Sequence, residues 1–277
     1  MFRVLLRIGN FQLYTWGVMV AIGFAAGLFV ASRRAKKFGV KPDTIVDLGV
    51  FLILASLIGS RFWYVITHIS EFSNNYWNII NPFQNGKIGI SGMAMVGGVI
   101  FGIATVLIFC AIKKINFFKL TDIIAPSFFL GMFLGRIGCF LNGCCFGREC
   151  SCFWGISYPP NSPAGYVFPG IPIHPTQLYE LLLNLIFFIF VIRWEPKGRK
   201  FYGNTFWMTF FLYGLGRAFV DYFRYYEPHE IVFNYLGGNI SIHGLFVLIF
   251  SCIALIFMVF KIGKSIQPTM SKNEKSS

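Results

Sequence analysis

Residues 241–261 read SIHGLFVLIFSCIALIFMVFK, an apolar run with one lysine at its end. A helix of about 20 mostly apolar residues can cross the hydrocarbon core of a bilayer. The whole 277-residue chain has the same character, with 56% hydrophobic and only 13% charged residues. A soluble globular protein carries about 25% charged residues. We therefore expect an all-α polytopic membrane protein, which excludes a disordered, collagenous or ordinary soluble chain.

Six more segments have the length and apolar content of a span, which gives seven transmembrane helices in all. We expect the spans at about 15–32, 44–69, 89–112, 119–142, 175–193, 202–223 and 241–261. Residues 1–264 then form a single membrane domain, and residues 265–277 form a disordered cytoplasmic tail. The loops 70–88 and 143–174 are rich in Asn, Gly, Pro and aromatic residues, and we expect them to form a small cap outside the membrane.

Lysine and arginine indicate the orientation of these spans. Sixteen of the 24 lie in the first, third and fifth inter-span loops and the tail, and five lie on the opposite side. Because cytoplasmic loops carry the excess of positive residues, we expect the N-terminus outside and the C-terminus in the cytoplasm. Topology and anionic lipid then account for the net charge of +13, so we expect no nucleic-acid partner.

Three arginines remain within the spans, namely Arg61, Arg136 and Arg217. A lipid-facing arginine at mid-helix costs about 2.5–3.5 kcal/mol on insertion scales, so each needs a partner. The candidate acidic partners are Asp47, Asp122, Glu180 and Asp221. Arg136 lies among glycines, which permit close backbone approach or an unwound segment lining a cavity. A guanidinium in such a cavity is suited to bidentate binding of a phosphate.

A polar cluster, HPTQLYE (174–180), lies at the outer entrance of the fifth span. Pro175 suits the first turn of a helix, in which Gln177 and Glu180 share one side and Tyr179 adjoins Glu180. His174 is a candidate base in this cluster. A lone histidine at an interface is more often a hydrogen-bonding residue than a catalyst, so both roles stay open.

The sixth span carries a third polar cluster, formed by Tyr213, Gly214, Arg217, Asp221 and Arg224. Arg224 is also one of the five positive residues counted on the outer side. Tyr213 and Arg217 are four residues apart, so they share a helix face and could hold one ligand. Asp221 follows Arg217 by one turn, which also allows a local and purely structural ion pair.

Five of the seven cysteines lie within 14 residues, in the pattern C-x4-C-C-x4-C-x-C, at the outer face. In an oxidising compartment such a group favours disulfides, and adjacent cysteines rarely pair with each other. We expect Cys144 or Cys145 to pair with Cys150 or Cys152, although the connectivity is open. A zinc site that includes Cys139 is the alternative, but the spacing matches no common C-x2-C pairing, so we expect no metal.

Together, these clusters resemble the prolipoprotein diacylglyceryl transferase family of bacterial inner-membrane enzymes. The matching stretches are GRIGCFLNGCCFG (135–147), HPTQLYE (174–180), YGLGRAFVDYFR (213–224) and TDIIAP (121–126). GMAMVGG (92–98) and LYTWGVMVAIGF (13–24) match more weakly. The stretches run from the first span to the sixth in family order, so their combination is far more specific than any one of them.

The resemblance implies transfer of the diacylglyceryl group of phosphatidylglycerol to the lipobox cysteine of a preprolipoprotein. The thiol becomes a thioether, glycerol phosphate leaves, and no cofactor is needed. We also expect a monomer in the inner membrane, with membrane lipid as its surroundings. Such a site must bind an anionic headgroup, deprotonate a thiol with a pKa of about 8.5 and stabilise the departing phosphate.

The resemblance also assigns roles to residues of this chain. Arg136 and Arg217 match the two essential arginines of the family and would bind the lipid phosphate, with Tyr213 adjacent. The matching signature positions are Asn142, Gly143 and Gly147. In HPTQLYE, the substrate-binding candidates are Gln177, Tyr179 and Glu180.

Four positions depart from the family pattern. A histidine that usually precedes the glycine pair of the third span, and that has been proposed as the base, is Val96 here. The usual asparagine and glutamate after the signature arginine are Cys139 and Cys144, and a first-span tyrosine is Trp16. His174 is then the nearest remaining candidate for the base. Alternatively, the phosphate clamp alone lowers the pKa of the acceptor thiol.

Three other readings of the sequence remain. The chain could be an inactive or redirected paralogue of the transferases. It could be a thiol-handling or metal-handling membrane protein that uses the Cys139–Cys152 cluster. It could also be a transporter with Arg136, Arg217 and Asp122 as intramembrane charges, although the repeated halves of many transporters are missing.

Overall fold

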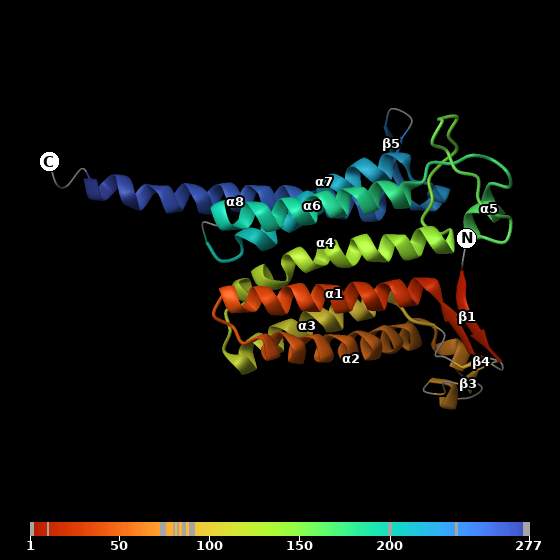
Figure 1. Ribbon diagram of the computed structural model, residues 1–277, viewed down its shortest axis with the longest axis horizontal. Coiled ribbons are helices and arrows are strands. Elements are labelled where there is room, and N and C mark those ends of the chain that lie inside the picture. The colour runs from red at the N-terminus through yellow and green to blue at the C-terminus, as the bar shows by residue number, and fades with distance from the viewer. Residues whose placement is uncertain are drawn as a thin grey trace. The chain divides into compact units, whose positions relative to one another are not determined.

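The computed structural model describes residues 3–9, 11–72, 76–79, 81, 83–84, 87–88, 92–198, 201–235 and 238–273, and it is mostly helical (Figure 1). The long helices are α1 (Thr15–Lys37), α2 (Pro42–Thr67), α3 (Met95–Lys113), α4 (Phe117–Asn142), α6 (Thr176–Gly198), α7 (Asn204–Phe223) and α8 (Ile242–Asn273). The short elements are α5 (Pro163–Val167) and three 3-10 turns at Ile69–Phe72, Tyr76–Ile79 and Pro228–Glu230. Two-stranded sheets pair β1 (Val4–Ile8) with β2 (Phe11–Tyr14), β3 (Phe83–Gln84) with β4 (Lys87–Ile88), and β5 (Ile231–Tyr235) with β6 (Gly238–Ser241).

Within these residues, six helices are long and apolar enough to cross a membrane: α1, α2, α3, α4, and the greater parts of α6 and α8. The protein is therefore an all-α polytopic membrane protein, as the sequence predicts. The expected count of seven is not confirmed. Helix α7 lies at the predicted sixth span, but Arg217 and Asp221 make it less apolar than the other six.

The chain divides into two compact units. The N-terminal unit contains Leu28–Leu120 with Val4–Leu13, and the C-terminal unit contains Thr121–Ser277 with Met1–Arg3 and Tyr14–Gly27. Each unit has its own packing.

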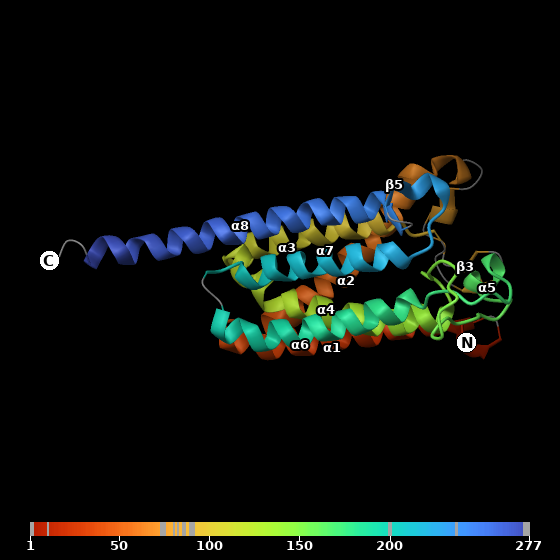
Figure 2. The ribbon, with the colours of Figure 1, turned by 90° about the horizontal axis from the view of Figure 1, so that it is seen from above.

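In the N-terminal unit, α2 and α3 lie side by side in both views of the structure (Figures 1 and 2). Glycines allow their backbones to touch. A methyl group on Gly97 would overlap the carbonyl oxygen of Gly59 and the Cβ of Trp63. A methyl group on Gly59 would lie 2.5 Å from the Cβ of Phe101. Small residues at such positions are how membrane helices gain close van der Waals contact.

Arg61 of this unit is held by backbone carbonyl groups. Its guanidinium donates to Ile79 O at 2.8 Å and to Gly92 O at 3.1 Å. Asp47, one of the expected arginine partners, instead forms an exposed pair with Lys113 at 3.6 Å. Arg61 therefore ties the loop after α2 to the start of α3.

In the C-terminal unit, α7 packs against both α6 and α8 (Figure 2). The fully buried carboxylate of Asp122 in α4 accepts hydrogen bonds from the backbone N–H groups of Gly203 (2.7 Å) and Phe206 (2.9 Å). These are donors that the first turn of α7 leaves without intrahelical partners. Asp122, which we had also considered as an arginine partner, is thus the cap that fixes where α7 begins.

The 143–174 loop is folded rather than loose. Tyr158, Ala164 and Ile173 form a small buried core, against which Phe146 and Phe168 pack. Of the other predicted outer loop, 70–88, residues 73–75, 80, 82 and 85–86 lie outside the described residues. The described part of α8 runs to Asn273, so it includes most of the expected tail, and residues 274–277 lie outside the description.

The contact between α2 and α3 yields a first prediction. Gly97→Ala inserts a methyl group where there is no room, and overpacking of this kind costs about 1–3 kcal/mol. We expect a lower unfolding temperature in detergent, measured by the loss of the monodisperse peak after heating. Gly17→Ala is the matched control, because a methyl group there meets nothing within 4 Å. Equal unfolding temperatures for the two variants would contradict the close packing.

Candidate functional site

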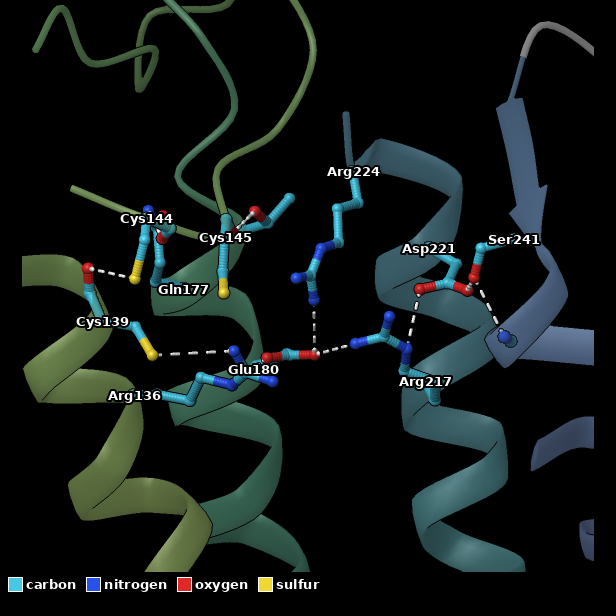
Figure 3. Close-up of polar contacts among 12 residues, drawn as sticks. Arg136, Cys139, Cys144, Cys145, Gln177, Glu180, Arg217, Asp221, Arg224 and Ser241 are labelled. Atoms are coloured by element: carbon cyan, nitrogen blue, oxygen red, sulfur yellow. Dashed lines mark hydrogen bonds and ion pairs between the residues drawn. The ribbon is translucent and has the colours of Figure 1, made fainter. Parts of the chain in front are cut away.

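The candidate site is built around one carboxylate, that of Glu180 on the second turn of α6. Arg136 of α4 forms an ion pair with it through Nε. Arg217 of α7 donates to its Oε1 at 3.0 Å, and Arg224, which caps α7, lies 3.8 Å from the same oxygen. Figure 3 shows these three guanidinium groups converging on Glu180 from different parts of the fold.

A second carboxylate, Asp221, holds Arg217 from behind. Arg217 Nε lies 2.8 Å from Asp221 Oδ1, which is the local pair that the spacing allows. The hydroxyl groups of Tyr226 and Ser241 donate to Asp221 at 2.6 and 3.0 Å. Burial raises the pKa of Tyr226 to about 12, although Arg217 and Arg224 oppose the shift. The phenol therefore remains protonated and keeps Asp221 in place.

The charges of this group do not cancel. Three guanidinium groups, on side chains that are 6–15% exposed, face two carboxylates, and the side chains of Glu180 and Asp221 are only 8% and 0% exposed. A formal excess of one positive charge in such a place favours an anionic ligand. Tyr213 lies with Arg217, Glu180 and Asn184 around a small pocket between α6 and α7.

The end of α4 is shaped by Gly143. This residue has a φ of 71°, and its N–H bonds to Phe140 O while the N–H of Cys144 bonds to Cys139 O at 3.2 Å. This pair of bonds is the Schellman motif, with glycine at the left-handed position after the Asn142 cap. The motif turns the chain sharply at the C-terminal end of α4, which also carries Arg136.

The first turn of α6 holds the chain that follows. Thr176 donates to Cys145 O at 2.9 Å, and Gln177 donates to Cys144 O at 2.8 Å. Gln177 is fully buried and accepts from the Tyr158 hydroxyl at 3.1 Å. The structure thus places Gln177 beneath the loop as a support.

Gly147 lies where two segments of the chain cross. Its N–H bonds to His174 O, and a side chain there would lie 2.6 Å from His174 and 2.7 Å from the carbonyl oxygen of Phe223. Gly143 and Gly147 therefore meet backbone requirements at the edge of the arginine group. The sequence pattern alone does not separate this role from ligand binding.

His174 belongs to a neighbouring aromatic group. Its Nδ1 lies 3.0 Å from the Tyr179 hydroxyl, which also accepts a hydrogen bond from Trp154 at 2.8 Å. The imidazole ring packs on Phe223, with ring centres 5.0 Å apart. Burial, and then the charge of Arg148, lower the pKa of His174. The imidazole is therefore neutral near pH 7 and able to accept a proton.

The cysteines do not pair as expected. The disulfide joins Cys150 to Cys152, and Cys144 and Cys145 are free thiols. The expected pairing was wrong because the turn after α4 directs Cys144 and Cys145 inward, toward Cys139 (Figure 3). Hydrogen bonds from the thiols of Cys139 and Cys144 lower the pKa of Cys145, and Arg224 and Arg136 act in the same direction.

Comparison with known proteins gives a consistent result. The family model described as prolipoprotein diacylglyceryl transferase matches residues 3–260. A phosphatidylglycerol–prolipoprotein diacylglyceryl transferase of Clostridium tetani is 30% identical over 94% of this chain and 97% of its own. Proteins of the same name from Fusobacterium nucleatum and Clostridium botulinum are each 33% identical, over 80% and 79% of this chain and 87% and 83% of theirs.

The chain belongs to the prolipoprotein diacylglyceryl transferase family. It is therefore a transferase, as the sequence motifs indicate. Of the residues singled out in the sequence of this transferase, the structure brings Arg136, Glu180, Arg217 and Tyr213 together. His174 and Tyr179 form the adjacent group, and the signature positions Asn142, Gly143 and Gly147 shape the turn between the two groups.

One residue of the transferase site was left out of the candidate site residues. Arg224 belongs to the polar cluster of the sixth span and follows Arg217 by seven residues, a spacing that places both on one face of a helix. The charge count assigned it to the outer side and gave it no role in the site. The i, i+7 spacing was the signal that could have identified it.

The central carboxylate yields a second prediction. Glu180→Ala leaves three guanidinium groups without their shared partner, and removing one side of a buried ion pair costs about 3–5 kcal/mol. We expect a large fall in the unfolding temperature in detergent, and a smaller one for Glu180→Gln because the amide oxygen can still accept a hydrogen bond. Asp47→Asn, in an exposed pair worth about 0–1 kcal/mol, is the control. A Glu180→Ala protein as stable as this control would show that the network is not structural.

Proposed function

We propose that this transferase moves the diacylglyceryl group of phosphatidylglycerol to the lipobox cysteine thiol of a prolipoprotein. The observation that carries the proposal is the convergence of Arg136, Arg217 and Arg224 on one buried carboxylate, in a member of this family. Arginine binds phosphate oxygens with two parallel N–H groups, so this group matches the headgroup of an anionic lipid.

Glu180 acts as the counterion that the lipid phosphate replaces in part. In the free protein it neutralises guanidinium groups that would otherwise repel one another at the ends of α4 and α7. When the phosphodiester enters, its oxygens take over N–H donors of Arg136 and Arg224, while Asp221 keeps Arg217 oriented. Tyr213, one turn before Arg217, borders the small pocket beside Glu180, next to the place that the phosphodiester would take.

The chemical step is an alkyl transfer. The acceptor sulfur attacks the glyceryl carbon that carries the phosphate, a C–S bond forms, and the C–O bond breaks. The electron pair of that bond leaves with glycerol phosphate, which gains negative charge in the transition state. Fixed guanidinium donors aimed at a developing charge are worth about 10²–10³ in rate each, by analogy with oxyanion-hole donors.

His174 is the proposed base for the acceptor thiol. Its lowered pKa leaves it neutral, and the Tyr179 hydroxyl fixes the orientation of its ring. The proposed substrate-binding residues Asn142, Gly143, Gly147 and Gln177 act by shaping the turn that borders the headgroup. Glu180 and Tyr179 link the two groups, because they are neighbours on α6.

The membrane setting follows the charge distribution. We propose that residues 1–264 act as one membrane domain of a monomer in the bacterial inner membrane. The N-terminus is then periplasmic and the C-terminal tail cytoplasmic, since most lysine and arginine residues lie on the tail side. This orientation puts the arginine group near the outer leaflet, where a secreted prolipoprotein arrives. Lipid and protein thereby reach the site from the membrane and the periplasm.

A complementation experiment tests the reaction. In a strain depleted of its own transferase, the wild-type chain should lipidate a reporter prolipoprotein, detected by its mass and by its partition into detergent. Arg136→Ala should lower the rate by about 100-fold or more, because a phosphate-binding donor is lost. Arg136→Lys keeps the charge facing Glu180 but loses the bidentate geometry, and it should also be impaired.

Two controls complete this experiment. Arg33→Ala, in an exposed arginine of α1, should lipidate the reporter like wild type. An epitope tag reports whether each variant accumulates in the membrane. A wild-type chain that accumulates without lipidating the reporter would overturn the proposed reaction, and a fully active Arg136→Ala would overturn the phosphate clamp.

The role of His174 yields a prediction on pH. Since the neutral imidazole is the active form, activity should fall as pH drops through the pKa of His174. Arg148→Gln removes a positive charge that lowers this pKa, so the pKa rises and the acidic limb of the kcat/KM profile moves to higher pH. The measurement is transfer to a lipobox peptide across pH 5 to 8. An unchanged limb in Arg148→Gln, or the same limb in His174→Gln, would exclude His174 as the base.

A further inference from the structure

Three thiols meet beside the arginine group. The sulfur atoms of Cys139, Cys144 and Cys145 all lie within 4.8 Å of one another, and Figure 3 shows them directed into the same space. Three sulfur atoms on one tetrahedral zinc ion, at about 2.3 Å each, lie about 3.8 Å apart. A small inward movement of each side chain would therefore close a three-thiolate site.

The backbone builds this arrangement. The Schellman motif places the residue three before the helix cap against the second residue after it, and this contact is usually apolar. Here both positions are cysteines, Cys139 and Cys144. Cys145, with a φ of 60°, turns the third thiol toward them. The C-x4-C spacing matches no common zinc pattern, because the proximity comes from the turn and not from a short C-x2-C loop.

The surroundings suit a negatively charged metal centre. A zinc ion with three thiolates carries a net charge of −1, and Arg136 Nη1 already lies 3.8 Å from the sulfur of Cys139. Hydrogen bonds from Gln177 and Thr176 fix the carbonyl groups of Cys144 and Cys145 and so hold the loop in position. Glu180 is engaged by the arginines, which leaves the thiols as the metal-binding groups at this place.

We propose that Cys139, Cys144 and Cys145 bind one zinc ion whose fourth position takes the thiol of the acceptor cysteine. Zinc sites with three protein ligands and an open position are typical of catalysis, and a thiol bound to zinc loses its proton. This inference rests on the proposed function and states how that function activates its nucleophile. It also accounts for two departures of the sequence together: thiols at positions 139 and 144, and Val96 where the family's histidine is expected.

The steps balance without any oxidant. Each of the three protein thiols releases one proton as it binds zinc. The acceptor thiol releases its proton to the base of the proposed function and becomes the fourth ligand. Its sulfur then forms the C–S bond, the C–O electron pair leaves with glycerol phosphate, and the thioether, a weaker ligand, dissociates from zinc.

Metal binding is measured on the full chain, purified in detergent under reducing conditions. Wild type should hold one zinc ion per chain, and cobalt in its place should give thiolate charge-transfer bands and the strong visible bands of tetrahedral coordination. Cys139→Ser, Cys144→Ser and Cys145→Ser should each weaken zinc binding by more than about 100-fold, the upper end for loss of a mere supporting group. Cys252→Ser, an exposed thiol on α8, is the matched control and should bind zinc like wild type.

The fourth position is tested by adding a lipobox peptide to the cobalt-loaded protein. The peptide with cysteine should strengthen the charge-transfer bands, and the same peptide with serine should not. Wild type that binds no zinc, zinc binding that survives all three substitutions, or a disulfide among these thiols in membranes alkylated before lysis would each overturn the inference. Lipidation that persists in a zinc-free protein sinks this inference alone. If the protein binds zinc but does not lipidate the reporter, the metal site stands and the proposed function is overturned.

Discussion

The buried carboxylate of Glu180 is the interaction on which the C-terminal unit depends. A guanidinium group inside a membrane is costly unless it is paired, and Arg136 and Arg217 both meet this one side chain, with Arg224 beside them at the end of α7. The pairing joins α4, α6 and the end of α7. The same pairing is incomplete in charge, even with Asp221 included, which suits the network to an anionic ligand. Helix association and the proposed binding of the lipid phosphate are thus two consequences of one electrostatic arrangement.

The turn after α4 borders the arginine group on one side. Gly143 ends the helix, and side chains in the first turn of α6 donate hydrogen bonds to the carbonyl groups of Cys144 and Cys145. Gly147 allows two segments of the chain to cross. All of these contacts engage the backbone of the turn after α4. The motifs GRIGCFLNGCCFG and HPTQLYE are distant in the sequence, but each depends on contacts with the other for its conformation.

Sequence reasoning was strongest where one physical rule dominates. Hydropathy located the helices, and the cost of intramembrane charge singled out Arg136 and Arg217. It was weaker where a residue has two chemically equivalent uses. The carboxylate of Asp122 suited an arginine as well as a helix end, and only the fold shows that it caps α7. The topology rule counted Arg224 with the charges on the outer side, and that count says nothing of its approach to Glu180. The closeness of Cys139 to Cys144 depends on a hydrogen-bonded turn that the spacing does not reveal.

In helix α7, the residues that lower its hydropathy also belong to the proposed site. It carries Arg217 and Asp221, and it contributes Tyr213 to the pocket, so the residues that serve the site are those that lower its hydropathy. Helix α7 is stabilised by its cap, Asp122, and by its packing against α6 and α8. In the other spans, the apolar surface provides this stability. A helix of this kind can remain in a bilayer only while its polar face is covered by protein. Hydropathy alone therefore does not identify as a span the helix whose polar residues carry much of the proposed site.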